Sequence, residues 1–575
     1  MEITVAEQLI ETLIAAGVKR VYGIVGDSLN AVTEAIRQRQ DEIQWIQVRH
    51  EEAAAFASGA EAALTGSLAV CAGSCGPGNL HLINGLFDCH RSRVPVLAIA
   101  AHLPSKEIGS SYFQATHPEN LFLECSHYCE LISTAAQMPR VLEEAIQASL
   151  TLRGVSVVVL PGDVAFEKME KTIPRLPALQ AVSHLSPSEE NLDRAAKILD
   201  TAKKVTILGG AGCADAHPEL LAAAERLKAP IVHALRGKEL IEYDNPYDVG
   251  MTGLLGFRAG FEAMKDCDVL LMLGTDFPYE QFYPEKAKII QVDIRGENIG
   301  RRARVEVGLV GGVKETLEGL LTRLQEHKDS DHLVTARKNY QTSLKEMNDL
   351  AQEGSGKKPI HPQFAARLID ELAAKDAIFT CDVGTPTVWA ARYLRMNGRR
   401  RLIGSFNHAS MAGAMPQGIG AQITFPDRQV VALCGDGGFS MLMGDLLTIR
   451  QLKLPVKLII FNNSTLSFVD QEMKATGLLS FGVHLDNPNF AQMAESMGIP
   501  GFRIEEPEKV QSQLTEAFRS AGPVLIDLVV NPVELAMPPH IDKEQAKGFG
   551  IFMLKAVLNG RSDEVTEIIK TNFGR

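Results

Sequence analysis

Two apolar stretches near residues 430 and 458 constrain the fold of this chain more than any other feature. Residues 430–434 run directly into Gly435-Asp436-Gly437, and residues 458–461 run into Asn462-Asn463. Because both runs are almost entirely apolar, they are predicted to be buried strands of a parallel sheet. Their ends would place an acid, an amide and glycine backbone at one edge of that sheet.

This edge suits a Mg²⁺ ion that holds a diphosphate. Mg²⁺ prefers oxygen ligands and in phosphate sites takes only one or two carboxylates. The predicted protein ligands are the Asp436 carboxylate, the Asn463 side chain and the Thr465 carbonyl. A lone Gly-Asp-Gly is also typical of a tight turn, and the Asn-Asn pair downstream is what favours the metal site.

Length and composition narrow the class of protein. A chain of 575 residues predicts three or four domains. The net charge of −12 disfavours nonspecific nucleic-acid binding. No apolar run reaches the roughly 18–20 residues of a membrane span, and the first residues do not resemble a signal peptide. The nine cysteines lack paired C-x-x-C spacing, so we expect reduced, mostly buried thiols in a cytoplasmic protein.

Short apolar strands alternate with helical stretches in three successive units. This pattern predicts an α/β protein with three doubly wound parallel-sheet domains, over residues 1–182, 183–334 and 335–530. A short helical segment is predicted over 531–575. The proline-bearing stretch 173–187 and the polar segment 326–358 are predicted to be linkers. The first and third units share the same order of elements.

The stretch from Gly-Asp-Gly to Asn-Asn resembles the thiamin diphosphate (ThDP) motif of the pyruvate oxidase and acetolactate synthase superfamily. The resemblance covers nearly the whole chain, and the runs 72–90, 380–392 and 434–444 resemble in particular the acetate-forming pyruvate:quinone oxidoreductases. It implies a ThDP pyrimidine domain, a central FAD-binding domain, a diphosphate and Mg²⁺ domain, and a membrane-binding C-terminal segment, in that order.

The opposite half of such a site needs an acid against the ThDP pyrimidine. Glu51 and Glu52 precede a helix rich in alanine, where either carboxylate could simply be a cap. The resemblance gives the cofactor-activating role to Glu51 and leaves Glu52 as a surface or capping residue. It makes Met411 the wedge under the bent cofactor, although methionine is commonly core filler. The ThDP-binding residues implied in this way are Glu51, Ala409, Ser410, Met411, Asp436, Gly437, Gly438, Asn463, Ser464, Thr465, Leu466, Ser467, Phe468 and Val469.

The central unit has a Gly-Gly-Ala-Gly turn after a strand at 205–212, which alone is weak support for a dinucleotide. The resemblance implies FAD, with Asp293 at a strand end binding ribose hydroxyls. Acetolactate synthases also carry FAD without using its redox change, so FAD does not decide the reaction. The implied FAD-binding residues are Thr252, Gly253, Leu254, Leu255, Thr275, Asp276, Phe277, Pro278, Tyr279, Asp293, Ile294, Arg295, Gly296, Glu297 and Asn298.

The resemblance also implies the residues around the reacting carbon. Phe468 would lie between ThDP and the flavin, although a buried core aromatic is the plain alternative. Glu472 would lie in the substrate pocket and Val383 over the thiazolium, and Phe113-Gln114 would face the pocket from a neighbouring subunit. Asp470 departs from the family pattern as a charged residue where a small one is expected. Together with Glu51, these are the predicted catalytic residues.

The tail combines apolar residues over 549–558 with lysines nearby. A helix packed on its own protein is the ordinary interpretation, whereas the resemblance implies a segment that lies on the membrane once the enzyme is reduced. The expected reaction converts pyruvate to acetate and CO₂, with electrons passing through FAD to a membrane quinone. A carboligase of the acetolactate synthase type and a non-redox 2-keto acid decarboxylase that retains FAD are the alternatives. With Glu51 from one subunit and Asp436 from another, we expect a homo-oligomer, by resemblance a tetramer, that is cytoplasmic and peripheral on the inner face of the cell membrane when reduced.

Overall fold

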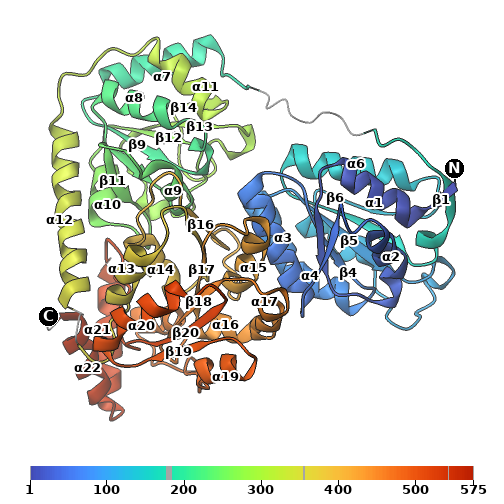
Figure 1. Ribbon diagram of the computed structural model, residues 1–575. Coiled ribbons are helices and arrows are strands. Elements are labelled where there is room, and N and C mark those ends of the chain that lie inside the picture. The colour runs from blue at the N-terminus through green and yellow to red at the C-terminus, as the bar shows by residue number, and fades with distance from the viewer. Residues whose placement is uncertain (1, 176–183, 354–356, 542, 574–575) are drawn as a thin grey trace.

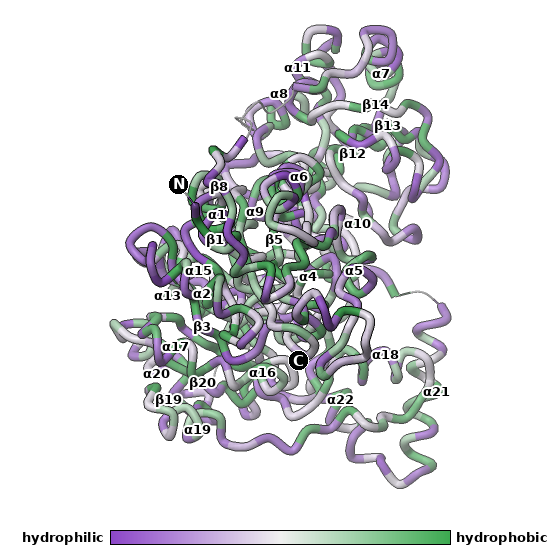
Figure 2. The backbone as a smooth tube through the Cα atoms, turned by 90° about the vertical axis from the view of Figure 1, so that its right-hand side faces the viewer, coloured by the Kyte–Doolittle hydropathy of each residue, from purple (hydrophilic) through white to green (hydrophobic). Residues whose placement is uncertain are grey.

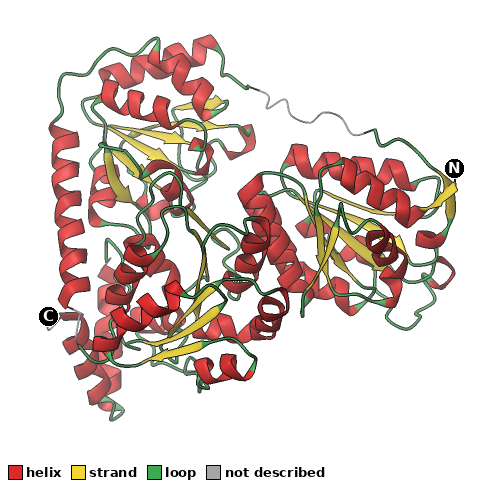
Figure 3. Ribbon diagram, viewed as in Figure 1, coloured by secondary structure: helices red, strands yellow, loops and turns green. Residues whose placement is uncertain are grey.

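The computed structural model describes residues 2–175, 184–353, 357–541 and 543–573. Three six-stranded parallel sheets with flanking helices follow one another along the chain (Figures 1 and 3). The predicted α/β fold class is therefore confirmed. The N-terminal and central units each lie against the third, and the predicted linker at 173–187 falls partly outside the described residues.

The first sheet has the strand order β3-β2-β4-β5-β7-β6, and a short antiparallel pair, β1 and β8, joins the start of this unit to its end. The strands are β1 (Glu2–Thr4), β2 (Arg20–Gly23), β3 (Gln44–Gln47), β4 (Ala69–Gly73), β5 (Val96–His102), β6 (Tyr128–Leu131), β7 (Val155–Pro161) and β8 (Lys168–Glu170). The helices are α1 (Val5–Ala15), α2 (Asn30–Gln38), α3 (Glu51–Thr65), α4 (Pro77–Ser92), α5 (Pro118–Leu121) and α6 (Met138–Leu152).

The third sheet has the order β16-β15-β17-β18-β20-β19. Counted along each unit, the first and third sheets both read second, first, third, fourth, sixth, fifth, which confirms their predicted likeness. The strands are β15 (Ile378–Cys381), β16 (Arg401–Gly404), β17 (Val430–Gly435), β18 (Lys457–Asn462), β19 (Gly501–Ile504) and β20 (Val524–Val529). The helices are α13 (Pro362–Leu372), α14 (Thr385–Tyr393), α15 (Ala414–Thr424), α16 (Asp436–Leu442), α17 (Leu446–Leu452), α18 (Ser467–Ala475), α19 (Phe490–Ser496) and α20 (Pro507–Arg519).

The central sheet differs, with the order β11-β10-β9-β12-β13-β14. This reads third, second, first, fourth, fifth, sixth, the order of dinucleotide-binding doubly wound folds. The strands are β9 (Val205–Gly209), β10 (Ile231–His233), β11 (Asp248–Met251), β12 (Val269–Leu273), β13 (Lys288–Asp293) and β14 (Val307–Val310). The helices are α7 (Glu189–Thr201), α8 (His217–Leu227), α9 (Lys238–Ile241), α10 (Arg258–Lys265), α11 (Val313–Leu321) and α12 (Asp331–Glu353).

Helix α12 corrects one prediction. Residues 326–358 were predicted to be a polar linker, but residues 331–353 form a long helix beside α10. The helix is polar except for one stripe, in which Leu333 and Ala336 are buried and Tyr340 packs against the same central core. Helix α12 also contacts β11 and α13, and its low apolar content explains the error. The predicted boundary between residues 334 and 335 lies inside α12.

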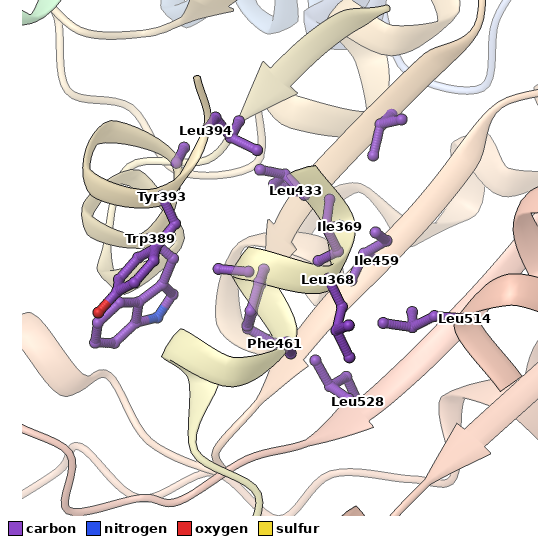
Figure 4. Packing of buried hydrophobic residues seen from close by; sticks show 14 of the residues in the cluster. Leu368, Ile369, Trp389, Tyr393, Leu394, Leu433, Ile459, Phe461, Leu514 and Leu528 are labelled. Atoms are coloured by element: carbon purple, nitrogen blue, oxygen red, sulfur yellow. The ribbon is translucent and has the colours of Figure 1, made fainter. Parts of the chain in front are cut away.

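The core of the third unit explains why its sheet is rigid. Figure 4 shows Leu433, Ile459, Phe461 and Leu528 from three neighbouring strands packed against helical side chains that include Trp389. The alternate residues of β17 and β18 are buried in a second cluster on the other face. Burying each large side chain contributes about 1.5–3 kcal/mol. The two-sided burial predicted from the apolar runs is confirmed, and it holds the carboxyl edge of the sheet in place.

The C-terminal segment forms α21 (Lys543–Leu558) and α22 (Ser562–Phe573). Phe552, Ala556 and Ile568 form a small buried cluster at the base of these helices, and α21 packs on α18. Among the described residues, no helix combines the length and the apolar character that crossing a bilayer requires. The nine cysteines are all free thiols, and burial raises the pKa of several of them, that of Cys71 to about 12.

Candidate functional site

The candidate site lies where the strand order of the third sheet reverses. Strand β15 is flanked by β16 on one side and β17 on the other, and the chain continues outward in opposite directions from this pair. Ligands of doubly wound sheets bind outside the carboxyl ends of the strands at such a point. Asp382 and Val383 follow β15 there, and Asp436 follows β17.

The Asp436 carboxylate is buried and surrounded by donors. It accepts hydrogen bonds from the Gly437 N–H at 2.9 Å, from the Ser464 N–H at 2.7 Å and from the Asn487 side chain at 2.8 Å. Burial raises the pKa of Asp436, and these hydrogen bonds oppose that rise. Sequence reasoning missed Asn487, whose side chain also donates to Asn462 at 3.0 Å and so joins the two strand ends.

The predicted metal ligands Asn463 and Thr465 lie in the turn that follows β18. The Asn463 side-chain oxygen accepts from the Thr465 N–H at 3.1 Å, and its amide nitrogen donates to Ser467 at 2.6 Å. Ser464 between them has a φ of 55°, a strained value for a residue with a side chain. Because Ser464 donates to Asp436, the turn brings carboxylate, amide and carbonyl oxygens together. These donors fit a hard cation such as Mg²⁺.

Met411 lies beside the turn after β17, which together with the turn after β18 forms the predicted Mg²⁺–diphosphate clamp. A Cβ atom added to Gly437 would lie 3.3 Å from the Met411 methyl carbon and 2.8 Å from Leu466. Glycine is therefore the only residue that leaves this contact undisturbed. Met411 is half-buried, while Ala409 and Ala412 on either side have φ values of 63° and 67°. The loop is thus held in a strained form against the clamp, as a wedge requires.

Glu51 begins α3 and is buried at the far side of the site. Its carboxylate lies 2.9 Å from Nδ1 of His81 on α4, and the His81 ring stacks on His50 at a centroid distance of 4.3 Å. A Cβ atom on Gly78 would approach the second Glu51 oxygen to 3.1 Å. Sequence reasoning missed His81. In the sequence, His81 could have been found as a site residue from its position three residues before Asn84, on a helix that follows a glycine-rich turn.

Asn84 joins the N-terminal and C-terminal halves of the site. Its amide nitrogen donates to Glu52 at 2.7 Å and to the Ser410 hydroxyl at 2.8 Å, and His408 lies 2.9 Å from its oxygen. Glu52, expected to be a surface or capping residue, is half-buried in the first turn of α3, and its carboxylate also accepts the hydrogen bond from Asn84. Asn84 therefore connects the start of α3, where Glu51 and Glu52 lie, with the predicted cofactor wall at Ser410.

These contacts occur within a single chain. Helices α3 and α4 lie against the third unit of the same chain (Figure 1), and the expectation that Glu51 meets the Asp436 turn of a second subunit stays a prediction. Small residues make this packing possible, since Gly420 of α15 packs directly on the Ala57 backbone of α3. The Arg49 N–H also donates to Asp445 of the third unit at 2.8 Å.

The predicted FAD residues gather at the carboxyl edge of the central sheet. Gly212 and Gly274 touch backbone to backbone at the end of β9 and β12, where the strand order reverses. Asp293, at the end of β13, accepts from the Asn298 amide at 3.0 Å. The Thr252 hydroxyl and the Asn298 side-chain oxygen are buried without a protein hydrogen-bond partner. Buried polar atoms of this kind are normally satisfied, so this edge fits a polar ligand such as FAD.

The predicted pocket residues are placed at three points. Phe468 and Glu472 lie one turn apart on α18, directly after the clamp, with Phe468 half-buried against the core of the third unit. Phe113 is 76% exposed, which suits contact with another subunit. Gln114 has a φ of 62° and accepts a hydrogen bond from the Cys75 thiol at 3.4 Å.

Comparison with known families agrees with this architecture. Residues 3–121 match the thiamine pyrophosphate enzyme N-terminal TPP binding domain, residues 192–320 the central domain, and residues 382–528 the C-terminal TPP binding domain. Each match falls inside one of the three predicted units.

Full-length relatives show the same relationship. The chain is 36% identical to the putative thiamine pyrophosphate-containing protein YdaP of Bacillus subtilis, over 99% of this chain and 98% of the relative. It is 30% identical to the pyruvate oxidase of Lactiplantibacillus plantarum, over 91% and 88%. It is 31% identical to a probable acetolactate synthase large subunit of Methanocaldococcus jannaschii, over 93% of each. The fold and the site define an enzyme built around thiamine pyrophosphate, that is ThDP. The chain belongs to the ThDP-dependent enzyme family that includes pyruvate oxidase and acetolactate synthase.

Proposed function

We propose that this protein is a pyruvate:quinone oxidoreductase that converts pyruvate to acetate and CO₂ and passes two electrons through FAD to a membrane quinone. The observation that carries this proposal is the position of the C-terminal helices. They dock on α18, the helix that bears Phe468 and Glu472, and they expose an apolar face. An enzyme that reduces a membrane-bound quinone must contact the membrane, and an exposed apolar face serves that contact. A carboligase has no such requirement.

Separate groups of residues would contact the pyrimidine, the diphosphate and the reacting carbon of ThDP. ThDP, when bound, supplies the carbon nucleophile that adds to the keto carbon of pyruvate. The Glu51 carboxyl holds a proton against the pyrimidine ring, and His81 fixes the orientation of that carboxyl. Asp436, Asn463 and Thr465 would hold Mg²⁺, which would offset the charge of the diphosphate. Val383 and Phe468 exclude water from the reacting carbon.

The exposed face of α21 suits an interfacial membrane contact. Leu554, Val557 and Leu558 are 62%, 51% and 75% exposed, and Phe481, in the segment after α18, is 86% exposed. Figure 2 shows α21 at the edge of the molecule with both apolar and polar stretches. Apolar area together with Lys547 would give weak, reversible binding to an anionic surface. We propose that the enzyme is a cytoplasmic homotetramer that lies on the inner face of the cell membrane when reduced.

Anaerobic mixing of the holoenzyme with pyruvate tests the reaction. We expect the flavin absorbance to bleach in step with CO₂ release, and a soluble quinone to restore it. Release of CO₂ while the flavin stays oxidised would refute the oxidase. Acetyl phosphate formed only when phosphate is present would place the enzyme in a phosphate-dependent class instead.

Carboligation is the second candidate, because the chain also resembles a probable acetolactate synthase over 93% of its length. That activity would give acetolactate from two pyruvate molecules with no net flavin reduction. A non-redox decarboxylase would give acetaldehyde. Product analysis of the same anaerobic mixture separates the three outcomes.

Deletion of residues 544–575 tests the membrane contact. We expect the reduced full-length enzyme to bind anionic liposomes and the truncated enzyme to remain in solution. The matched control is Lys547→Gln, which should weaken binding in low salt but retain it in part. Equal liposome binding by the full-length and truncated enzymes would contradict the assignment.

A further inference from the structure

We infer that Asp382 is a positioning residue that fixes the distance between the loop predicted to contact the ThDP pyrimidine and the turn predicted to hold its diphosphate. This role has no place in the sequence-based site. It rests on ThDP occupying this site, and it is independent of whether the reaction is oxidative.

The Asp382 carboxylate joins two segments that lie 32 and 53 positions further along the chain. Its Oδ1 accepts from the Ala414 N–H at 2.9 Å, just after the loop that carries Met411. Its Oδ2 accepts from the Gly435 N–H at 3.3 Å, directly before the predicted metal ligand Asp436. One carboxylate therefore ties the pyrimidine side to the diphosphate side.

Close packing leaves the carboxylate no freedom to move. Asp382 is 1% exposed, and a Cβ atom on Gly438 would lie closer to its Oδ2 than van der Waals contact allows. The same Cβ would lie 3.2 Å from the Ala412 N–H. Gly438 thus permits the loop and the turn to approach each other around the acid.

The chemistry of this position argues against a purely structural acid. Burial raises the pKa of Asp382 to about 7, while the N–H groups of Ala414, Gly435 and Gly413 lower it. None of the hydrogen bonds described for the carboxylate involves a cation. Burying an unpaired acid is costly, and a smaller neutral residue would complete the core at lower cost.

The position of Asp382 beside the predicted cofactor site accounts for burying a carboxylate there. Val383, the next residue, is predicted to lie over the thiazolium, so the strand end that carries Asp382 forms the third wall of the site. A bent ThDP must touch the pyrimidine loop and the diphosphate turn at once. A fixed distance between these walls lowers the ordering cost of binding the whole cofactor. The affinity of a ligand that touches only the diphosphate turn does not depend on the distance between the two walls.

Equilibrium dialysis of the apo-protein with two ligands tests this directly. ThDP touches both walls and inorganic pyrophosphate only one, and both are measured with saturating Mg²⁺. For Asp382→Asn we expect ThDP affinity to fall about 10-fold to 100-fold, since the amide cannot accept from both N–H groups. Pyrophosphate affinity should change less than about threefold.

Asp370→Asn is the matched control. Asp370 is an equally buried acid of the same unit that pairs with Arg395 and Arg400 and lies on α13. Its removal should lower the melting temperature without changing the ratio of the two affinities. Asp382→Ser is a second variant, which fills less space and should show the same selective loss if Asp382→Asn does not fold.

Two outcomes overturn the inference. Unchanged ThDP affinity in folded variants would show that the carboxylate positions nothing. An equal loss of both ligands would show that Asp382 only supports the unit as a whole. Failure of the wild-type protein to bind ThDP would instead refute the site, and oxidised flavin in the pyruvate experiment would refute only the reaction.

Discussion

The Lys474 ammonium lies 3.2 Å from the Glu564 carboxylate and so joins α18 to α22. The same nitrogen donates to Asp470 at 2.7 Å and lies 5.3 Å from the centre of the Phe552 ring on α21. One almost fully buried cation therefore connects the helix that follows the cofactor clamp with both C-terminal helices. Asp470, which departs from the family pattern, serves this contact.

Replacing Lys474 by methionine should loosen the C-terminal helices. The change leaves the buried Asp470 carboxylate without its ammonium partner, at a cost of about 3–5 kcal/mol, while the half-buried Glu564 keeps only Arg561 at 2.8 Å. We expect faster chymotryptic cleavage within residues 543–573 while the rest of the chain stays resistant. Glu567→Gln, at an exposed position of α22, is the control and should match the wild type. An unchanged cleavage rate for Lys474→Met would contradict this coupling.

Glu51→Gln should abolish most of the activity without releasing ThDP. An amide cannot share a proton with the pyrimidine ring, and loss of such proton transfer typically costs about 10²- to 10⁴-fold in rate. Flavin reduction by pyruvate measures the effect. Glu52→Gln is the control at the neighbouring position. The Glu52 carboxylate accepts a hydrogen bond from Asn84 at 2.7 Å, whereas the carboxylate beside His81 is that of Glu51. A smaller loss for Glu51→Gln than for Glu52→Gln would reverse the assignment.

Asn487→Ala should weaken binding of the Mg²⁺–diphosphate group. Asn487 donates to Asp436 at 2.8 Å and to Asn462 at 3.0 Å, so its loss leaves the metal-binding acid less well oriented. We expect about a tenfold loss of ThDP affinity. The measurement is ThDP affinity as a function of Mg²⁺, where Asp436→Ala should lose the metal dependence altogether. If Asn487→Ala retained the wild-type Mg²⁺ requirement, the orienting role would be wrong.

Asp248→Asn should flatten the pH dependence of stability. Burial, and then repulsion by Glu242, raises the pKa of Asp248 to about 7. The folded protein therefore holds this proton more tightly than the unfolded chain, and stability from this group is present at low pH and lost as pH rises from about 4 to about 7. The variant should melt at a higher temperature than the wild type above pH 7, and the gap should close towards pH 4. Parallel melting curves for the two proteins across this range would contradict the raised pKa.

Several elements of the site follow from local sequence. The runs that became β17 and β18 are apolar over their whole length, and their ends carry Asp436 and Asn463, which the structure brings into one turn region. Such patterns are visible because a buried parallel strand is apolar on both faces. The polar helix α12 escaped prediction because only one stripe of its surface is buried.

The sequence by itself determined the three α/β units and the ends of β17 and β18, because these depend on short runs of apolar residues. It also showed that an acid follows the first of these strands and an amide the second, because both residues come directly after the apolar runs. Only the tertiary structure decided which distant side chains meet. Asn84 contacts Ser410, Asn487 contacts Asp436, and Asp382 holds the loop after Met411. These contacts depend on how the units pack and on where parallel strands end. The paired residues are 326, 51 and 32 positions apart, and short-range sequence patterns carry no signal of contacts over such separations.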